Sequence, residues 1–268
     1  MNKLVLAVLD GLNYEVAAQC MGYCQALCEA GKGRLYQVQC ALPSLSRPLY
    51  ACLLSGKLPV ESGIVCNATV KRLEVPTIFS LCQAQGKVTA ASAYHWISEL
   101  CNHAPYDPIT DRIVHDMHKP INHGIFYMWD DYADECVIND AEMLRRAYQP
   151  DLLYFHPMNI DDCGHHYGFD SMEYRNQARK VDVLISRFID TWLNEGYQVI
   201  ITSDHGMNND KSHGGTLAIE RQVPFFTFGD AFTLKENLSL KQTEICGLCA
   251  NILGLTHNLP HPTDFLRK

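Results

Sequence analysis

Short runs of apolar, often β-branched residues alternate along the chain with longer stretches of helical character. The apolar runs fall at about 3–9, 34–42, 88–94, 151–156, 197–202 and 223–228. The helical stretches fall at about 13–30, 76–85, 138–148, 171–195 and 241–254. Runs that are apolar throughout are typical of strands buried on both faces of a parallel sheet, with the stretches between them as crossover helices. We therefore expect an α/β fold with a mostly parallel central sheet covered by helices.

Residues 171–195 carry the clearest helical pattern. Their apolar residues recur in steps of four and three, as in an amphipathic helix, and Gly196 follows as a stop signal. The apolar positions are Tyr174, Ala178, Val181, Ile185, Phe188 and Trp192. We expect this face to pack in the protein core rather than to bind a cofactor.

Residues 101–136 show no clear period. This range mixes histidine, proline and aromatic residues, which is typical of an irregular surface segment. We expect one domain over residues 1–268, with a small surface insertion or lid at 101–136. Such a lid could contribute to a binding site, although an irregular loop can also be only a connection.

The composition is that of an ordinary folded protein. The chain has 268 residues, of which 47% are hydrophobic and 19% are charged, so it can bury one large core. Its formal net charge of −8 disfavours a polymeric nucleic acid as the ligand, because phosphate backbones attract basic surfaces. Small phosphate esters stay possible, since a bound metal ion can reverse the local charge.

The first apolar run stops at Asp10, and it is too short for a signal peptide, so we interpret it as a buried strand. No apolar run approaches the roughly 18 residues that suggest a membrane span. The twelve cysteines come without a signal peptide, which favours reduced thiols and a cytoplasmic location. Some cysteines are spaced so that they could be imagined as metal ligands, but we expect buried small apolar side chains: Cys20, Cys24, Cys28, Cys246 and Cys249.

Acidic and histidine side chains follow several predicted strands, at the edge where open parallel sheets place their ligand sites. Asp10 ends the first strand. Asp204 and His205 end the strand at 197–202, and His213 comes shortly after, next to a glycine. An Asp-His pair at a strand end, with another histidine close by, is a rare combination that favours a metal site. Asp10 alone could also be a turn residue.

Asp161 and His165 belong to a segment rich in acids and imidazoles. Four positions apart, they could share one face of a helical turn and bind one metal ion, and carboxylate with imidazole suits zinc. A plain polar loop is the alternative. Further histidines could also reach such a site, although we expect packed or surface positions for them: His95, His156 and His166.

Ser46 precedes a helical stretch at Leu49 to Ser55, and Pro48 suits a first helical turn. A serine at this position would lie where backbone N–H groups and the helix dipole attract an oxyanion or a phosphate. A plain serine N-cap is the alternative.

Taken in order, these segments resemble the alkaline phosphatase superfamily, and within it the nucleotide pyrophosphatase/phosphodiesterase branch. That branch has a strand-end Asp, a nucleophile in a Pro-x-x-Thr/Ser segment, a Ser/Thr-Gly-x-x-Pro-x-x-x-Gly-Ile stretch, an Asp-x-x-Gly-His, an Asp-His-Gly and a late His-Gly. The matching residues are Asp10, Pro43 to Ser46, Ser55 to Ile64, Asp161 to His165, Asp204 to Gly206, and His213 with Gly214. The resemblance spans nearly the whole chain. It implies an alkaline-phosphatase-like three-layer sandwich, with helices on both faces of the sheet.

The resemblance also implies a hydrolase with two divalent metal ions, zinc first, with manganese or iron as alternatives. The implied ligand sets are Asp161, His165 and His213 for one ion, and Asp10, Ser46, Asp204 and His205 for the other. Ser46 would be the nucleophile and would form a phosphoseryl intermediate. Asn67 would contact a phosphoryl oxygen, with an exposed turn residue as the alternative.

The substrate class is left open by one departure from the pattern. The branch usually has Thr followed by an aromatic residue, whereas this chain has Ser46 and Arg47. Arg47 could bind a dianionic phosphomonoester, or it could be a solvated charge at the helix start. Tyr50 stands where sulfatases carry Arg, which argues against sulfatase chemistry.

We therefore expect cleavage of phosphate diesters or nucleotide pyrophosphate bonds in a small phosphate ester or nucleotide. A phosphomonoesterase, a phosphonate hydrolase and a non-catalytic metal-binding module are the alternatives. The oligomeric state is not predicted.

Overall fold

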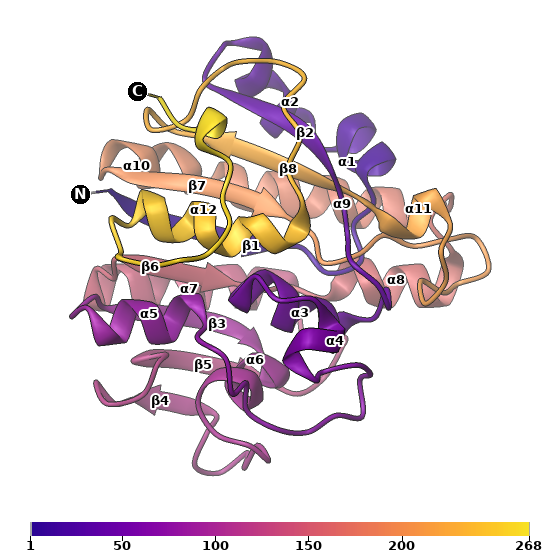
Figure 1. Cartoon of the computed structure of the whole chain (residues 1–268). Helices are drawn as coiled ribbons and strands as arrows, with labels where there is room; N and C mark the ends of the chain where they lie inside the picture. Colours follow the sequence, from indigo (N-terminus) through magenta and orange to yellow (C-terminus); the bar gives the residue numbers. More distant parts are fainter. Residues whose placement is uncertain (1, 268) are drawn as a thin grey trace.

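The computed structural model describes residues 2–267 and places eight strands in one sheet, with helices on both faces (Figure 1). The strands are β1 (Lys3–Val8), β2 (Gly33–Gln39), β3 (Thr89–Tyr94), β4 (Ile113–His115), β5 (His123–Tyr127), β6 (Leu152–Phe155), β7 (Tyr197–Thr202) and β8 (Gln222–Phe228). Their order in the sheet is β2-β8-β7-β1-β6-β3-β5-β4. The strands from β7 to β5 in this order pair in parallel, while β8 and β4 run antiparallel to their neighbours. The expected mostly parallel sheet is confirmed.

Two helical layers cover the sheet. One consists of α3 (Ser46–Ser55), α5 (Ile78–Ala84), α6 (His95–Cys101) and α12 (Ile245–Ile252), which lie in front of the sheet in Figure 1. The other consists of α1 (Tyr14–Cys20), α2 (Gly22–Glu29), α7 (Asp134–Tyr148), α9 (Met172–Ser186) and α10 (Ile189–Asn194), behind it. The remaining helices are α4 (Pro59–Ser62), α8 (Asn159–Tyr167), α11 (Ala218–Arg221), and the 3-10 turns η1 (Gln242–Glu244) and η2 (Thr263–Phe265). The expected three-layer arrangement is confirmed.

Strand β1 shows why the central runs are apolar throughout. Successive side chains of a strand point to opposite faces, and both faces of this sheet are covered. Leu4, Leu6 and Val8 therefore pack in the core of the α12 side. Val5 and Ala7 pack in the core of the α9 side.

The predicted helical stretches lie at the correct positions, but two of them are each divided into two helices. The stretch 13–30 is two helices, α1 and α2, which meet at Met21. The stretch 171–195 is likewise divided, since α9 ends before Arg187 and α10 begins after Phe188. The apolar face of this stretch packs in the core, as expected: Tyr174, Ala178, Val181, Ile185 and Trp192 are buried.

The interpretation of residues 101–136 as an irregular insertion is wrong for part of the range. It contains β4 and β5, which extend the sheet beyond β3. Strand β4 has only three residues and is half exposed, so no apolar run marks it. The segment after β5 reaches the edge of the sheet where the predicted site residues gather, and its residues 128–131 line a pocket there together with α8.

Two further features of the structure bear on the sequence predictions. Within residues 2–267, no helix combines the length and the apolar character that a membrane crossing requires. All twelve cysteines are free thiols. The cysteines that could be imagined as metal ligands pack instead as apolar side chains, because Cys20, Cys24, Cys246 and Cys249 are buried and Cys28 is partly buried in the core.

Candidate metal centre

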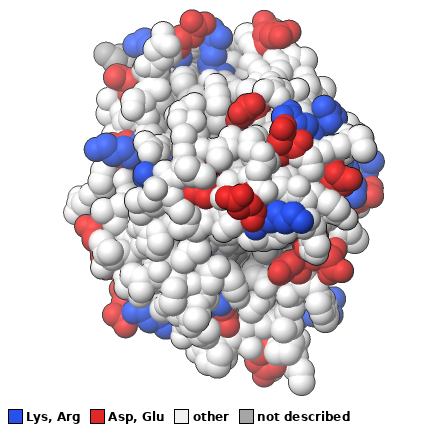
Figure 2. Space-filling model, turned by 90° about the vertical axis from the view of Figure 1, so that its right-hand side faces the viewer, with Lys and Arg blue, Asp and Glu red and all other residues white. Residues whose placement is uncertain are grey.

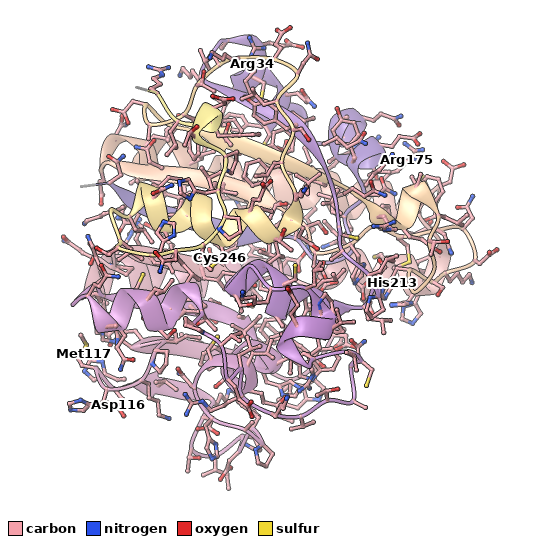
Figure 3. The ribbon with its side chains drawn as sticks, viewed as in Figure 1. Arg34, Asp116, Met117, Arg175, His213 and Cys246 are labelled. Atoms are coloured by element: carbon pink, nitrogen blue, oxygen red, sulfur yellow. The ribbon has the colours of Figure 1, made fainter. Side chains whose placement is uncertain are left out.

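The predicted ligands come from segments that are far apart in the chain and meet at one edge of the sheet. Asp10 follows β1, Asp204 and His205 follow β7, and α8 after β6 carries Asp161. These strands are parallel neighbours, so their carboxyl ends lie side by side. Figure 2 views this face of the molecule, on which acidic and basic side chains are interspersed. His213 lies at this edge, whereas Asp116 and Met117 lie at the opposite end of the sheet (Figure 3).

The three predicted histidine ligands are oriented in the same way. His205 Nδ1 lies 2.9 Å from Gly206 O, His213 Nδ1 lies 2.8 Å from Ser44 O, and His165 Nδ1 lies 2.9 Å from Lys211 O. A carbonyl oxygen can only accept, so each Nδ1 must carry the proton and donate it. In His205 and His213 the Nε2 then has a free lone pair, which is the state in which imidazole binds a metal ion. In His165 the hydrogen bond with Asp161 raises the pKa to about 9, so without a metal ion its Nε2 also carries a proton near pH 7.

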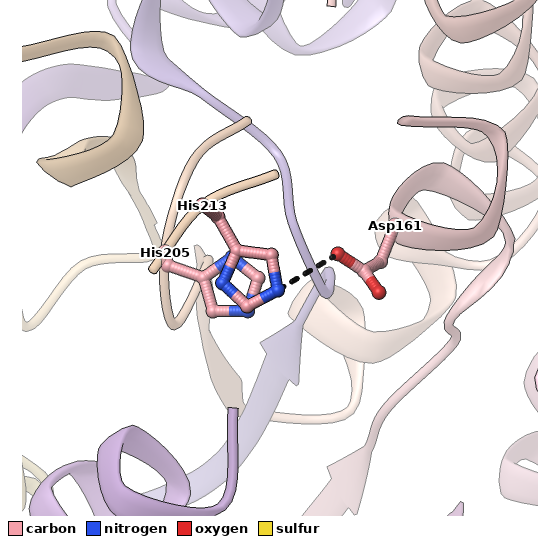
Figure 4. A group of neighbouring side chains, drawn as sticks. All are labelled: Asp161, His205 and His213. Atoms are coloured by element: carbon pink, nitrogen blue, oxygen red, sulfur yellow. Dashed lines mark ion pairs between the residues drawn. The ribbon is translucent and has the colours of Figure 1, made fainter. Parts of the chain in front are cut away.

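These free nitrogen atoms point at carboxylate oxygens, which are also acceptors. His205 Nε2 lies 3.1 Å from Asp204 Oδ2 and 3.5 Å from Asp10 Oδ1. Figure 4 shows His213 Nε2 facing Asp161 Oδ1 at 4.0 Å. Among the described residues, none donates a hydrogen bond to these three oxygens. Buried acceptors that face one another need either a proton or a cation between them, so the donor set fits metal ions.

Two groups of ligand atoms are close enough to hold an ion. One group is Asp10, Asp204 and His205, and the other is Asp161, His205 and His213, with the atoms of each group within 4.8 Å of one another. All of these side chains are buried. The rings of His205 and His213 stack at 3.6 Å, so His205 stands between the two groups.

His165 lies at the border of the second group. Its Nε2 is 3.3 Å from Asp161 Oδ2, one helical turn away on α8, and its side chain is 43% exposed. It is not part of the compact group that His205 completes. Its assignment as a metal ligand, like that of the other ligands, stays a prediction.

The electrostatics of the centre reflect crowded acids. Burial raises the pKa of Asp161 and of Asp204, and the charge of Asp10 raises both further. Burial also lowers the pKa of His205, and it lowers that of His213 to about 4, so both imidazoles are neutral near pH 7. Neutral imidazoles and closely spaced carboxylates are the ligands that divalent ions of the zinc type bind.

Ser46 is the first residue of α3, and its side chain points into the centre. The hydroxyl Oγ lies 3.0 Å from His205 Nε2, to which it can donate its proton. The residue that caps α3 is Leu45, without a side-chain hydrogen bond, so the interpretation of Ser46 as a plain N-cap is wrong. The serine is therefore free for chemistry at the start of a helix.

Gly11 contacts Asp204 and leaves the space that Asp161 needs. Its backbone N–H donates to Asp204 Oδ1 at 3.2 Å, and its φ of +72° suits glycine. A Cβ at this position would lie 2.7 Å from Asp161 Oδ1. Any other residue would therefore displace Asp161.

Asp10 has two neighbours that sequence reasoning did not assign to the site. The Tyr50 hydroxyl donates to Asp10 Oδ2, and His156 Nε2 donates to the same oxygen at 3.0 Å. Burial raises the pKa of Asp10, but the hydrogen bond from His156, with smaller contributions from the charges of the neighbouring histidines and from the Tyr50 hydrogen bond, brings this pKa to about 2. His156, which we expected to be a packed or surface residue, is buried against a predicted ligand. Its position directly after β6 is the signal that could have found it.

Asn67 and Arg47 are linked through the start of α3. The backbone N–H of Arg47 donates to Asn67 Oδ1 at 3.1 Å, so the Asn67 amide lies beside the nucleophile segment. The Arg47 guanidinium pairs with Glu99 at 2.8 Å and lies over the Trp96 ring at 4.3 Å. The interpretation of Arg47 as a solvated charge is wrong, since the residue is only 2% exposed. A role in substrate binding stays a prediction.

Comparisons with known proteins agree with this arrangement. A family model described as type I phosphodiesterase / nucleotide pyrophosphatase matches residues 4–224. The human GPI ethanolamine phosphate transferase 2, catalytic subunit, is 21% identical over 98% of this chain and 27% of its own length. Ectonucleotide pyrophosphatase/phosphodiesterase 2 of Saccharomyces cerevisiae is 26% identical over 69% of this chain and 42% of its own length. The chain thus spans less than half of these relatives.

Among solved structures, inactive murine ectonucleotide pyrophosphatase / phosphodiesterase 5 in complex with AMP superposes with a TM-score of 0.77. The match covers 100% of both chains at 16% sequence identity. This likeness supports the fold.

Proposed function

The chain belongs to the type I phosphodiesterase / nucleotide pyrophosphatase family, and from this membership and the geometry of its centre we propose that it is a two-metal hydrolase that cleaves phosphate diesters or nucleotide pyrophosphate bonds. The reaction would pass through a covalent phosphoseryl intermediate at Ser46. One observation carries the proposal. Free imidazole nitrogens and unpaired carboxylate oxygens converge beside the Ser46 hydroxyl.

The ligands would divide between two divalent ions. Asp10, Asp204, His205 and Ser46 would hold one ion, and Asp161, His165 and His213 would hold the other. Bound ions would supply the positive charge that lowers the pKa of a serine or a water and stabilises a leaving oxygen. Zinc suits the mixed carboxylate and imidazole donors, with manganese or iron as alternatives.

The chain's own groups would perform the substitution at phosphorus. Ser46 Oγ, without its proton, forms a bond to phosphorus as the bond to the leaving oxygen breaks. Water then attacks the same phosphorus and releases Ser46. The Asn67 amide, held by the Arg47 N–H, would donate to a phosphoryl oxygen and stabilise its growing charge.

The surroundings of Arg47 favour a diester over a monoester. A dianionic monoester would need a free cationic fork, but Glu99 already neutralises this guanidinium inside the protein. The phosphomonoesterase alternative therefore has less support than the sequence alone allowed.

Transfer to an alcohol is the second candidate reaction. A relative that aligns with 98% of this chain is named an ethanolamine phosphate transferase. Attack on the phosphoserine by an alcohol instead of water would give such a transfer without any change in the first step.

Steady-state assays on metal-analysed protein test the proposal. The substrates are p-nitrophenyl phosphate, bis-p-nitrophenyl phosphate and p-nitrophenyl thymidine monophosphate, each with and without added alcohol. We expect close to two metal ions per chain and turnover of the diesters. Ser46→Ala should abolish that turnover, while Ser186→Ala, at a partly exposed serine at the end of α9, should keep it. If the protein is isolated without metal and still cleaves no ester after metal ions are added, the mechanism would be overturned.

A further inference from the structure

Gln242 makes two backbone contacts that no step of the proposed reaction uses. It lies in η1, outside residues 4–224 that the family model matches, and its side chain is buried. Its Nε2 donates to the backbone oxygen of Asp204 at 2.7 Å, and its Oε1 accepts from the backbone N–H of Ala41 at 2.8 Å. One planar amide therefore joins the end of β7 to the connection between β2 and α3.

The end of β7 is a firmly held part of the fold. Strand β7 is paired on both sides, with β1 and with β8. Beyond the strand, the Gly11 N–H donates to Asp204 Oδ1 at 3.2 Å. Asp204 thus keeps its place through contacts that do not involve Gln242, and it is a predicted ligand of the ion beside Ser46. Gln242 can transfer this fixed position to its other partner.

The other partner belongs to the connection that carries the nucleophile. Ala41 lies five residues before Ser46, and the residues between them form neither a strand nor a helix. The backbone oxygen of Ser44, in the same connection, lies 2.8 Å from His213 Nδ1 and orients that predicted ligand. A shift of this connection would therefore move the Ser46 hydroxyl relative to the metal centre.

We propose that Gln242 is a positioning residue, which fixes the Ser46 hydroxyl relative to Asp204. The inference rests on the proposed function, and it adds a residue that contacts neither the substrate nor a metal ion. The 3-10 turn η1 also packs against α3, the helix that begins at Ser46. Attack at phosphorus requires the reacting atoms to be held in a fixed geometry, and a misplacement of about 1 Å can lower the rate by about 10²-fold.

Gln242→Met tests the proposal, because it removes both hydrogen bonds and keeps the length of the side chain. A pocket of about 430 Å³ is lined by Gln242 and Ala41, so water can reach the freed N–H of Ala41 and the variant should fold. For bis-p-nitrophenyl phosphate we expect kcat to fall by about 10- to 100-fold, with KM within about two-fold of the parent value. The zinc affinity, measured by competition with a chromophoric chelator, should stay that of the parent, since the ligand side chains keep their contacts.

Gln198→Met is the matched control. Gln198 is also buried, but it lies near the start of β7, at the opposite end of the strand from Asp204. Its amide likewise has two partners, since Oε1 accepts from the Ala231 N–H at 2.9 Å and Nε2 donates to Asp230 Oδ1 at 2.8 Å. This variant should lose stability in urea unfolding as Gln242→Met does, yet keep the parent kcat. Equal losses of kcat in the two variants would reveal a general structural effect and overturn the proposal.

Gln242→Asn is a second variant, in case the methionine variant does not fold. Asparagine keeps both polar groups, but it is one methylene group too short to reach both partners. Its kcat should fall by about ten-fold or more. A parent-like kcat in this variant would overturn the proposal. A zinc affinity that falls in proportion to kcat would also overturn it, because Gln242 would then support a metal ligand rather than the nucleophile.

Crystal structures of the parent and of both methionine variants, each with chelator, separate this proposal from the proposed function. Ser46 Oγ lies 3.0 Å from His205 Nε2. This separation should grow by about 1 Å in Gln242→Met and stay the same in Gln198→Met. An unchanged separation in Gln242→Met would contradict the positioning role, whether or not the parent cleaves esters. A longer separation, in a protein whose parent cleaves no ester, would support the positioning of Ser46 and contradict the hydrolase.

Discussion

His156 Nε2 donates a hydrogen bond to Asp10 Oδ2 across 3.0 Å, and both side chains are completely buried. The bond occupies one oxygen of the carboxylate and leaves Asp10 Oδ1 without a protein donor. A hydrogen-bond partner of this kind orients a metal ligand and raises the affinity of the site for its metal ion.

We therefore expect His156→Ala to lower the affinity for metal by about 10- to 100-fold. His156→Gln, which keeps a donor, should recover part of the loss. Competition with a chromophoric chelator measures the affinity without any use of activity. His118→Ala, at an exposed histidine, is the control. Equal affinities for His156→Ala and the parent would show that Asp10 needs no such partner.

Asn67→Ala should lower kcat/KM for a diester by about 10²- to 10³-fold, because one donor to the phosphoryl oxygen is lost. Metal content should not change, since Asn67 contacts the Arg47 N–H and none of the predicted metal ligands. Asn176→Ala, at an exposed helical position, should behave as the parent. If metal content falls together with the rate, the role assigned to the amide is wrong.

The buried pair of Arg47 and Glu99 should be important for stability. Arg47→Met or Glu99→Gln removes one partner and leaves the other charge buried, so each should reduce the free energy of unfolding by about 3–5 kcal/mol. Arg187→Met breaks the exposed pair with Glu135, and the expected loss is about 0–1 kcal/mol. Urea unfolding curves of the three variants and the parent measure these losses. Similar losses at both pairs would contradict the distinction between buried and exposed charges.

Glu142 should make stability depend on acid pH. Burial raises the pKa of Glu142, but hydrogen bonds from Arg145, Trp192 and Arg146 bring it to about 2, below the unfolded value of 4.5. A group with a lowered pKa contributes stability above its unfolded pKa and loses it as the pH falls through its folded pKa. Glu142→Gln should thus cost about 2 kcal/mol at pH 7 and progressively less from pH 4.5 towards pH 2. A constant difference between variant and parent at pH 7, 5 and 3 would refute the linkage.

Asp204→Asn should have opposite effects with and without metal. Without metal, burial and then the charges of Asp10 and Asp161 disfavour the ionised Asp204 side chain and raise its pKa, so its replacement should raise the Tm. With zinc, the variant loses a ligand, so it should melt at a lower temperature than the parent, which zinc stabilises by about 4 kcal/mol at a thousand times Kd. Thermal melts of the variant and the parent, with chelator and with zinc, measure both Tm differences. A Tm that shifts in the same direction in both conditions would argue against a metal at Asp204.

Local pattern was sufficient for the central sheet, because strands that are buried on both faces are apolar throughout. It failed at β4 and β5, since β4 has three residues and β5 contains His123 and Gly124. Their strand character comes from pairing with β3 and with each other, and a local pattern does not contain that information.

The candidate site shows a similar division. Asp10 and Asp204 could be found because acids directly after buried strands form a visible pattern. The position of His205 between the two ligand groups could not be found, because it depends on how the loop after β7 packs against α3. Tyr50 was equally hidden, since a single tyrosine inside a helix carries no signal of the carboxylate that it contacts.

One group of candidate ligands contains Asp10 and Asp204, and the other contains Asp161 and His213. A chain that has formed only its first strands and helices has no such constellation, because β1 and β7 must already be paired before Asp10 meets Asp204. Contacts between residues so far apart in sequence form late, since a long loop must close before they are made. High-affinity metal binding is therefore a property of the completed fold, and metal uptake during refolding should report the last stage of assembly rather than guide the first.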